Sequence, residues 1–299
     1  MLLGLAVKLG AMLREGPAAL NEFVSIESAL AEAIALLQSA SESPRLDAEL
    51  LLARALDVPR SYLIAHPEDE LDPAAGERFF SVVRRRAGGE PIAYIAGERE
   101  FWSMNLMVSP ATLVPRPETE ILVERALMFI PRKAAMRVLD LGTGSGAIAL
   151  AIARERPLCE IVATDLSDQA LAVAKQNARQ LDVANVTFYH GDWIAPVHDQ
   201  RFDIVVSNPP YVRSDDPALR SLAHEPVAAL AAGPDGLDAI RHIAATTGRL
   251  LPDRGMLLLE HGHDQKVAVE GILRDNGWYD IDCISDYSGL PRVTIARAG

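Results

Sequence analysis

The sequence predicts an α/β protein with a doubly wound, mostly parallel sheet, preceded by a small helical domain. From Ile121 onward, short apolar runs alternate with stretches of helical spacing, and this alternation is typical of parallel strands joined by helices. Between Ser25 and Gly88, apolar residues recur at helical spacing and strand-like runs are absent. The chain has 299 residues, 49% of them apolar, which is enough for one large domain and one smaller one.

Residues 1–24 are expected to form a poorly ordered leader. The apolar opening from Met1 to Val7 is interrupted by Lys8 and Arg14, and it is too short to span a bilayer. No basic stretch precedes it, so it does not fit a targeting signal. We therefore expect no association with a membrane.

Residues 25–90 are expected to form an N-terminal helical domain. Breaks at Asp57-Val58-Pro59 and Leu71-Asp72-Pro73 divide the segment into about four short helices, the last of which ends near Gly88-Gly89. The triplet Arg84-Arg85-Arg86 suits the last turn of a helix, where cations are favoured; contact with an anionic partner is the alternative. Helical spacing is carried by these apolar residues: Ile26, Leu30, Ile34, Leu37, Leu46, Leu50 and Ala53.

Residues 91–117 are expected to form a β-hairpin linker. Aromatic, β-branched and turn residues replace the helical pattern there, and Tyr94-Ile95-Ala96-Gly97 and Phe101-Trp102 flank a charged turn.

Residues 118–299 are expected to form the sheet domain. Helical spacing follows the first and second strands, at Ala147 to Ala153 and at Ser167 to Leu181. The last two runs flank a turn at Gly289-Leu290-Pro291, so they predict a closing hairpin and one antiparallel strand. The seven strand candidates are Arg137 to Leu141, Glu160 to Thr164, Val186 to His190, Phe202 to Ser207, Met256 to Glu260, Tyr279 to Ser285 and Arg292 to Ala296.

The most informative motif is Asn208-Pro209-Pro210-Tyr211, which follows the fourth strand candidate. Adjacent prolines remove two backbone donors and fix φ, so the chain leaves the sheet in a stiff corner. The corner presents an amide, unpaired carbonyls and an aromatic ring. A planar group bearing NH2 could donate to the Asn208 side-chain oxygen and the Pro209 carbonyl while its face lies on Tyr211. A simple turn at the end of a strand is the alternative.

Three other strand ends carry candidate binding residues. In a doubly wound sheet, ligands bind outside the carboxyl ends of the strands. The first strand runs into a glycine-rich turn that offers close backbone approach and a helix N-terminus, although such turns can also be purely structural. Its G-x-G-x-G spacing and its acidic residue fit a cationic cofactor better than a diphosphate. The turn comprises Asp140, Leu141, Gly142, Thr143, Gly144, Ser145 and Gly146.

Asp165 and the pair Asp192-Trp193 end the second and third strands. Asp165 is placed to accept hydrogen bonds from two ribose hydroxyls, or alternatively to serve as a helix N-terminal charge ahead of Ser167. Asp192 and Trp193 suit the amino group and the face of an adenine, or alternatively Trp193 is a core residue beside a turn.

Charge and cysteine usage exclude several classes of protein. The formal net charge of −12 argues against an extended nucleic-acid footprint and favours a protein or small-molecule substrate. Cys159 and Cys283 lie far apart in apolar stretches, which predicts no disulfide framework and a reducing, cytoplasmic location. His261 and His263 are spaced as in a loop or helix cap, so we expect no metal.

These motifs resemble those of S-adenosylmethionine-dependent methyltransferases that act on planar amino groups, and more closely the PrmC/HemK family of release factor glutamine methyltransferases. The resemblance covers about nine-tenths of the chain; Glu90, where the family commonly has Gln, and the leader depart from it. It is carried by Glu90-Pro91-Ile92-Ala93-Tyr94-Ile95-Ala96-Gly97, Phe101-Trp102, Pro115-Arg116-Pro117-Glu118-Thr119-Glu120, Asn208-Pro209-Pro210-Tyr211, His224-Glu225-Pro226 and Glu260-His261-Gly262.

The resemblance implies a Rossmann-like fold and methyl transfer from S-adenosylmethionine to the glutamine of a Gly-Gly-Gln loop in peptide chain release factors. Catalysis would fall to Asn208, Pro209, Pro210 and Tyr211, which together with Arg116 would also bind the substrate. Asn208 would contact the cofactor as well, beside the glycine turn, Asp165, Asp192 and Trp193. The helical domain would recognise the release factor, and we expect a monomer.

Three other functions are open at this point. A nucleic-acid amino-methyltransferase could use the same corner on adenine or guanine, but the acidic charge counts against it. A nicotinamide-dependent dehydrogenase is opposed by the glycine spacing and by the lack of a positioned His or Tyr. A non-catalytic nucleotide-binding module is opposed by the intact corner, and fold alone decides none of these.

Overall fold

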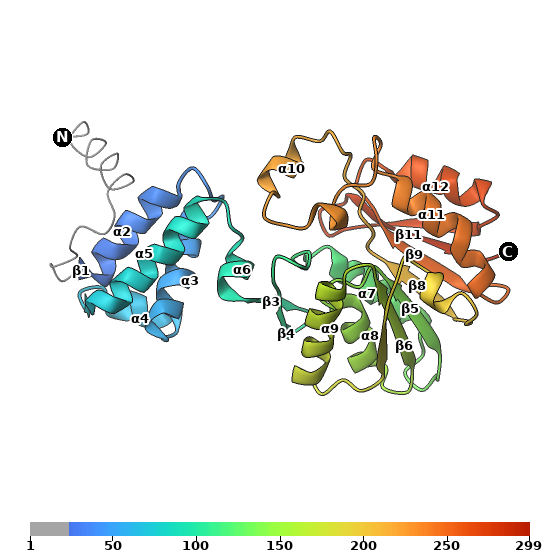
Figure 1. Ribbon diagram of the computed structural model, residues 1–299, viewed down its shortest axis with the longest axis horizontal. Coiled ribbons are helices and arrows are strands. Elements are labelled where there is room, and N and C mark those ends of the chain that lie inside the picture. Colours follow the sequence, from blue (N-terminus) through green and yellow to red (C-terminus); the bar gives the residue numbers. More distant parts are fainter. Residues whose placement is uncertain (1–23) are drawn as a thin grey trace. The chain divides into compact units, whose positions relative to one another are not determined.

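The computed structural model describes residues 24–299, and all but one residue of the expected leader lie outside that range. The chain divides into two compact units between Ala96 and Gly97 (Figure 1). Within residues 24–299, no helix is long and apolar enough to cross a membrane.

The first unit is a helical bundle around one apolar core. Ser25 caps the first helix by accepting from the backbone N–H of Ser28, and Asp72 caps the long helix α5 (Pro73–Ala87) by accepting from the N–H groups of Ala74 and Ala75. A two-residue ladder, β1 (Val24–Ser25) with β2 (Glu70–Leu71), was not expected, because so short a bridge leaves no alternating pattern in the sequence. The helices are α2 (Ile26–Leu37), α3 (Pro44–Leu56), α4 (Arg60–Ala65), α5 (Pro73–Ala87) and α6 (Ile92–Ala96).

The expectation of a strand over Tyr94-Ile95-Ala96-Gly97 is wrong. Pro91 starts the short helix α6 there, and its carbonyl accepts from the backbone N–H groups of Tyr94 and Ile95. The hairpin follows instead, with β3 (Glu98–Phe101) paired to β4 (Met104–Met107). Its turn is Trp102-Ser103, both with positive φ, so the charged residues expected in the turn form β3 itself.

The second unit contains the seven-stranded sheet, which confirms the predicted fold class. The strand order is β10-β11-β9-β8-β5-β6-β7, and β11 is antiparallel to both of its neighbours while the remaining pairs are parallel. The strand ends lie within two residues of the predicted ones. The strands are β5 (Arg137–Leu141), β6 (Glu160–Asp165), β7 (Val186–His190), β8 (Ile204–Ser207), β9 (Met256–Glu260), β10 (Tyr279–Ser285) and β11 (Pro291–Arg297).

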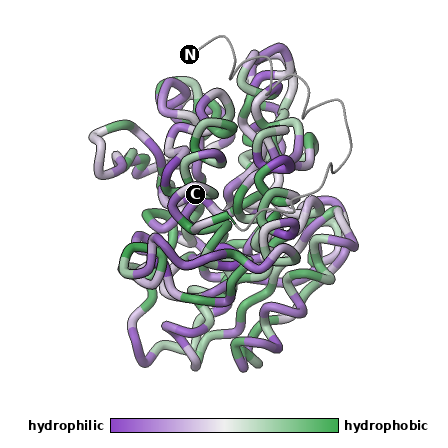
Figure 2. Tube along the Cα trace, turned by 90° about the vertical axis from the view of Figure 1, so that its left-hand side faces the viewer, coloured by the Kyte–Doolittle hydropathy of each residue, from purple (hydrophilic) through white to green (hydrophobic). Residues whose placement is uncertain are grey.

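Helices cover both faces of this sheet (Figure 1). Alternate strand residues point to opposite faces, so Val138 packs in the cluster with α7, α8 and α9, whereas Leu139 packs in the cluster with α11 and α12. Hydrophobic and hydrophilic residues alternate within single helical turns (Figure 2), as expected for helices with one buried face. The helices are α7 (Thr119–Phe129), α8 (Ala147–Glu155), α9 (Asp168–Gln180), α10 (Ala218–Ser221), α11 (Asp238–Thr247) and α12 (Lys266–Asp275), with 3-10 turns at Ala195–Val197, Val227–Ala229 and Gly248–Leu250.

The strand order determines where a ligand site can form. The chain builds β5, β6 and β7 outward in one direction and then returns to place β8 on the other side of β5. The carboxyl ends of β8, β5, β6 and β7 are therefore neighbours at one edge of the sheet. This edge carries all four of the chemically unusual strand ends found in the sequence.

Candidate active site

The glycine turn after β5 is held tightly against the neighbouring strand. The backbone N–H groups of Gly142 and Thr143 both donate to the Thr164 carbonyl, at 2.9 and 3.0 Å. Gly142, Gly144 and Gly146 all have positive φ, between 57° and 85°, which explains why glycine occupies each position. A Cβ on Gly146 would lie 3.1 Å from Leu150, whereas a Cβ on Gly144 would meet no atom within 4 Å. Gly144 therefore borders open space, while Gly146 is closely packed.

Asp140 lies buried beneath this turn. One carboxylate oxygen accepts from the Thr143 hydroxyl at 2.6 Å, and the other, Oδ1, has no hydrogen-bond partner. Burial raises the pKa of Asp140 to about 7, and the Thr143 hydrogen bond opposes that rise. A buried carboxylate oxygen without a donor is costly, so a cationic or N–H-bearing ligand at this point would stabilise the ionised form.

Asp165 joins the end of β6 to the glycine turn. Its Oδ2 accepts from the backbone N–H of Gly144 at 2.8 Å, and its Oδ1 accepts from that of Ser167 at 2.8 Å. The second contact is the helix-start role that the sequence offers as the alternative for Asp165. Because a carboxylate can accept about four hydrogen bonds, the half-buried group retains capacity for ligand hydroxyls.

Trp193 lies against the other side of the glycine turn. Its ring would be 3.7 Å from a Cβ built on Gly142, and its centroid is 6.2 Å from that of His242. Trp193 has a φ of 45°, an uncommon conformation for a bulky residue, and is half-buried, whereas the adjacent Asp192 is exposed. The structure thus brings Asp140, Asp165 and Trp193 around the same turn.

The Asn-Pro-Pro-Tyr corner begins where β8 ends, next to the glycine turn of β5. Ser207 ties the two strands together by donating its hydroxyl to the Leu141 carbonyl at 2.7 Å. Asn208 donates its side-chain Nδ2 to the Thr119 hydroxyl at 3.1 Å, which turns its carbonyl oxygen away from Thr119. Tyr211 donates its hydroxyl to Glu260 Oε1 at 3.3 Å, and burial raises the pKa of Tyr211 well above its ordinary value. Thr119 therefore fixes the Asn208 amide, and Glu260 fixes the Tyr211 ring.

Thr119 and Glu260 hold Asn208 and Tyr211 in place, and the sequence motifs alone do not assign them this role. Thr119 is the first residue of α7 and is 3% exposed, and Glu260 is the last residue of β9 and is 1% exposed. Burial raises the pKa of Glu260 to about 7, against the effects of the Arg292 charge and the Tyr211 hydrogen bond, and its Oε2 has no hydrogen-bond partner. Both residues stood in motifs that carry the family resemblance. Nothing in the sequence, however, indicates that these two motifs meet.

Arg116, expected to bind substrate, is paired within the protein. Its guanidinium donates to the buried Glu225 at 2.5 Å, and the other Glu225 oxygen accepts from the backbone N–H of Val114 at 3.1 Å. Glu225 thereby connects the loop before α7 with the loop after the corner. With its side chain 33% exposed, Arg116 could still contact a substrate while it is held by Glu225.

Asn177 on α9 fixes the glycine turn from the hairpin side. It is fully buried; its Nδ2 donates to the carbonyls of Ser145 and Met107, and its Oδ1 accepts from the Met107 N–H. The turn is therefore supported by β6, α9 and the hairpin together.

His261, one of the two histidines whose spacing could suggest a metal site, is buried and has three partners, one of which is Cys283 Sγ at 3.7 Å from its Nε2. Its Nδ1 bonds the Gly262 carbonyl and its Nε2 bonds the Thr294 hydroxyl, each at 2.8 Å, and burial lowers its pKa. Across residues 24–299, no group of three or more His, Cys, Asp or Glu is placed to hold a metal ion.

Replacing Gly144 with alanine is expected to separate ligand binding from folding. The Cβ meets no protein atom, so the free energy of unfolding should fall only by the strain of positive φ, about 1–2 kcal/mol. Any ligand lying against the turn would meet the new methyl group, so S-adenosylmethionine affinity should fall at least about tenfold, or 1.4 kcal/mol. Thermal denaturation and titration calorimetry measure the two effects, with Gly271→Ala in α12, which also meets no atom, as the control. Unchanged cofactor affinity would contradict a ligand at Gly144.

Known proteins resemble this chain over nearly its whole length. Residues 28–97 match the family model described as the PrmC N-terminal domain, and residues 118–233 match that of the methyltransferase small domain. The release factor glutamine methyltransferase of Coxiella burnetii is 46% identical over 92% of this chain and 100% of that protein. That of Escherichia coli K12 is 45% identical over 90% of this chain and 97% of its own length.

Solved structures share the fold at low sequence identity. A 16S rRNA methyltransferase from T. Thermophilus, in complex with AdoMet and guanosine, aligns with a TM-score of 0.51 and 19% identity over 68% of this chain and 50% of that one. A methyltransferase from Pyrococcus furiosus aligns with a TM-score of 0.50 and 16% identity over 66% of this chain and 89% of its own. These two support the fold alone, whereas the closer relatives cover both units. The chain belongs to the family of release factor glutamine methyltransferases.

Proposed function

We propose that this protein methylates the side-chain amide nitrogen of the glutamine in the Gly-Gly-Gln loop of peptide chain release factors, using S-adenosylmethionine. The observation that carries the proposal is the fixed Asn208 amide beside the glycine turn. Its Nδ2 is engaged by Thr119, so its carbonyl oxygen is free to accept from a substrate NH2. Relatives at 45–46% identity bear the name of this activity.

The residues around the glycine turn fit S-adenosylmethionine. The unpaired buried Oδ1 of Asp140 suits the ammonium group of the cofactor, and the open space at Gly144 admits a ligand against the backbone. Asp165 has hydrogen-bonding capacity left for ribose hydroxyls, and Trp193 offers a ring face for the adenine, with Asp192 beside it for the adenine amino group. When bound, the cofactor supplies an electrophilic methyl group on a sulfonium centre.

The protein's own residues act mainly by positioning. An amide nitrogen is a poor nucleophile because its lone pair is delocalised, and no side chain of the corner is basic enough to deprotonate it. The Asn208 side-chain oxygen and the Pro209 carbonyl each accept a hydrogen bond from one N–H of the substrate amide. Pro210 keeps the corner rigid, and the Tyr211 ring provides a flat surface beside the amide. The nitrogen gains electron density from these bonds and later loses a proton to water. The two acceptors also select a primary amide over other groups.

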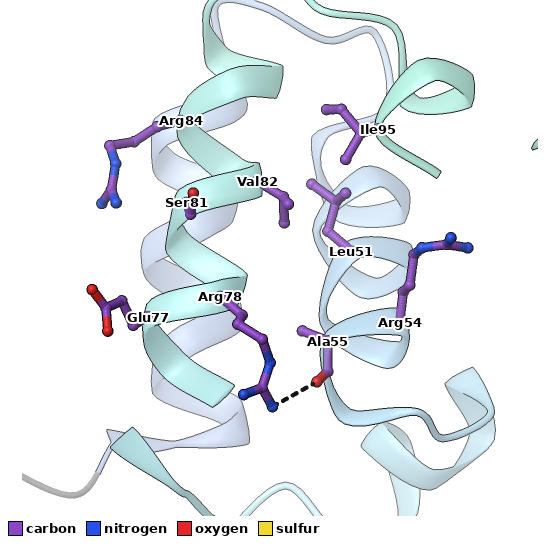
Figure 3. Close-up of a pocket in the computed structure, with 9 residues that line it drawn as sticks. All are labelled: Leu51, Arg54, Ala55, Glu77, Arg78, Ser81, Val82, Arg84 and Ile95. Carbon is purple, nitrogen blue, oxygen red and sulfur yellow. Dashed lines mark hydrogen bonds between the residues drawn. The ribbon is translucent and has the colours of Figure 1, made fainter. Parts of the chain in front are cut away.

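We assign recognition of the release factor to the helical unit. An open groove of ≈530 Å³ lies between α3, α5 and α6, with Leu51, Val82 and Ile95 facing one another across it (Figure 3). Three arginines, Arg54, Arg78 and Arg84, line it against one acid, Glu77. In a chain of net charge −12, this local positive balance suits a protein surface that carries acidic side chains. The enzyme would bind its substrate as a cytoplasmic monomer.

Labelled S-adenosylmethionine with candidate acceptors tests the proposed function. We expect label in the release factor, lost when its Gly-Gly-Gln glutamine is replaced by alanine, and none in DNA or rRNA. If the protein were a nucleic-acid amino-methyltransferase, DNA or rRNA would be labelled and the release factor would not. Label in nucleic acid alone would overturn the proposal.

A further inference from the structure

Asn177 joins the glycine turn to the β3–β4 hairpin through its side-chain amide. It lies on α9 and is fully buried. Its Nδ2 donates one hydrogen to the Ser145 carbonyl at 2.9 Å and the other to the Met107 carbonyl at 3.0 Å, and its Oδ1 accepts from the Met107 N–H at 2.8 Å. The two hydrogens of one amide therefore bond two segments that are far apart in the sequence.

The hairpin presents Met107 to α9 because of the hydrogen-bonding pattern of β4. Successive N–H groups of a strand point to opposite sides, and the next one along, that of Val108, donates to the Gly97 carbonyl across the hairpin at 3.0 Å. The Met107 N–H and carbonyl therefore face away from β3, and the Asn177 amide bonds both of them, as a neighbouring strand would. This two-bond contact fixes the plane of the amide and, with it, the direction of its remaining N–H.

The remaining N–H of Asn177 holds the part of the glycine turn that borders open space. Ser145 lies between Gly144, where a Cβ would meet no atom, and Gly146, which is closely packed. Glycine on both sides would let the Ser145 backbone rotate readily, and the hydrogen bond to its carbonyl restricts that rotation. The conformation of the turn at Gly144 therefore depends on Met107 being in place.

We propose that Asn177 is a positioning residue for S-adenosylmethionine, and that cofactor binding at the glycine turn is coupled through its amide to the order of the hairpin at Met107. This inference rests on the cofactor site of the proposed function, and no acceptor substrate enters it. Asn177 acts through the Ser145 carbonyl and does not touch the cofactor. Coupling of this kind is reciprocal, so a cofactor that holds the turn also holds Met107, and loss of the link weakens cofactor binding by the same factor.

Titration calorimetry with S-adenosylmethionine and steady-state kinetics test the role of Asn177 in the Asn177→Ala variant. Without the amide, we expect the turn to spend about a tenth of its time or less in the binding conformation, so Kd should rise at least about tenfold. Saturating cofactor selects that conformation, so kcat with saturating cofactor and release factor should stay within about threefold of wild type. A role in folding alone gives the opposite result, because a partly unfolded preparation has a lower kcat and an unchanged Kd.

Asn185 provides a matched control at the opposite edge of the sheet. Its Nδ2 donates to three carbonyls where α8 leads into the amino end of β6, at 3.0–3.3 Å, those of Ala153, Arg156 and Cys159. Asn185→Ala also removes an amide that bonds backbone carbonyls, so both variants should have a lower Tm than wild type. Cofactor affinity should fall in Asn177→Ala alone, and Asn185→Ala should keep Kd within about twofold of wild type.

Hydrogen exchange tests the coupling in the wild-type protein, without any substitution. Saturating S-adenosylmethionine, in the absence of release factor, should slow exchange of the Met107 amide at least about fivefold, and this effect should be lost in Asn177→Ala. The Cys159 amide, which bonds the Arg156 carbonyl at the opposite edge of the sheet, should change by less than about twofold.

Two results would overturn the inference: a wild-type Met107 amide whose exchange does not respond to cofactor, or an Asn177→Ala variant whose Kd stays within about twofold of wild type. Methyl label in nucleic acid and not in release factor would instead overturn the proposed function. The binding and exchange measurements use no acceptor, so they still decide the role of Asn177 in that case.

Discussion

Replacing Asn208 with alanine should lower kcat for release factor methylation by about 100-fold or more, a loss typical of removing one well-placed polar group from a reacting centre. In the proposed function the Asn208 oxygen accepts from the substrate amide, and the Thr119 hydroxyl holds the Asn208 amide in place. The substrate would keep its contact with the Pro209 carbonyl, so binding of the release factor should change less than kcat. Single-turnover transfer of labelled methyl groups measures the loss directly.

A control variant and a measurement of cofactor affinity show whether the loss of rate in Asn208→Ala is specific to the methyl-transfer step. Asn276→Ala removes an exposed asparagine that bonds only backbone at the end of α12, and it should leave the rate unchanged. Calorimetry should show nearly wild-type cofactor affinity for Asn208→Ala, because most of the proposed cofactor contacts lie on the glycine turn, Asp165 and Trp193. A variant that keeps more than half of the wild-type rate would exclude the amide as the orienting group.

The sheet could be predicted from the sequence because its strands are short, apolar and regularly separated by helices. Val138 and Leu139 pack on opposite faces, so both faces are apolar, and a continuous apolar run between breakers is the expected pattern for such a strand. The hairpin could not be placed as well. Glu98–Phe101 is a strand with two exposed acidic residues, and such a charged stretch between apolar runs predicts a turn.

The sequence predicts those residues of the candidate site that directly follow a parallel strand. Asp140, Asp165, Trp193 and Asn208 follow successive parallel strands, and parallel strands bring their carboxyl ends to one edge of the sheet. Thr119, Glu225 and Glu260 lie on a helix, a loop and a strand far apart in sequence, so their contacts depend on the register of tertiary packing. The sequence also left two roles open for Asp165, and its contacts with Gly144 and Ser167 show that the helix-start role does not exclude the other.

Replacing Asp165 with alanine should weaken S-adenosylmethionine binding by about 1.5–3 kcal/mol, through lost hydrogen bonds between the charged carboxylate and ribose hydroxyls. The structure adds a second expected effect. The backbone N–H groups of Gly144 and Ser167 each lose their acceptor, so the free energy of unfolding should fall by about 1 kcal/mol even without ligand. Calorimetry measures the first quantity and chemical denaturation the second. The control is Asp168→Ala, an exposed acid three residues further on, in the first turn of α9.

Comparing Asp165→Ala with Gly144→Ala distinguishes direct contact from support of the turn. If Asp165 served only to hold the Gly144 N–H, its loss would loosen the turn, and adding the Gly144 substitution would cost little more affinity. If it also bonds the ribose, the two losses arise from different contacts, and the double variant should lose close to the sum of both. Wild-type cofactor affinity in Asp165→Ala would remove this residue from the cofactor site, leaving Asp140 and Trp193 to define the site. A purely additive double variant with a large Asp165 effect would instead place the ribose against the end of β6, next to the glycine turn of β5 that we propose to hold the ammonium group of the cofactor.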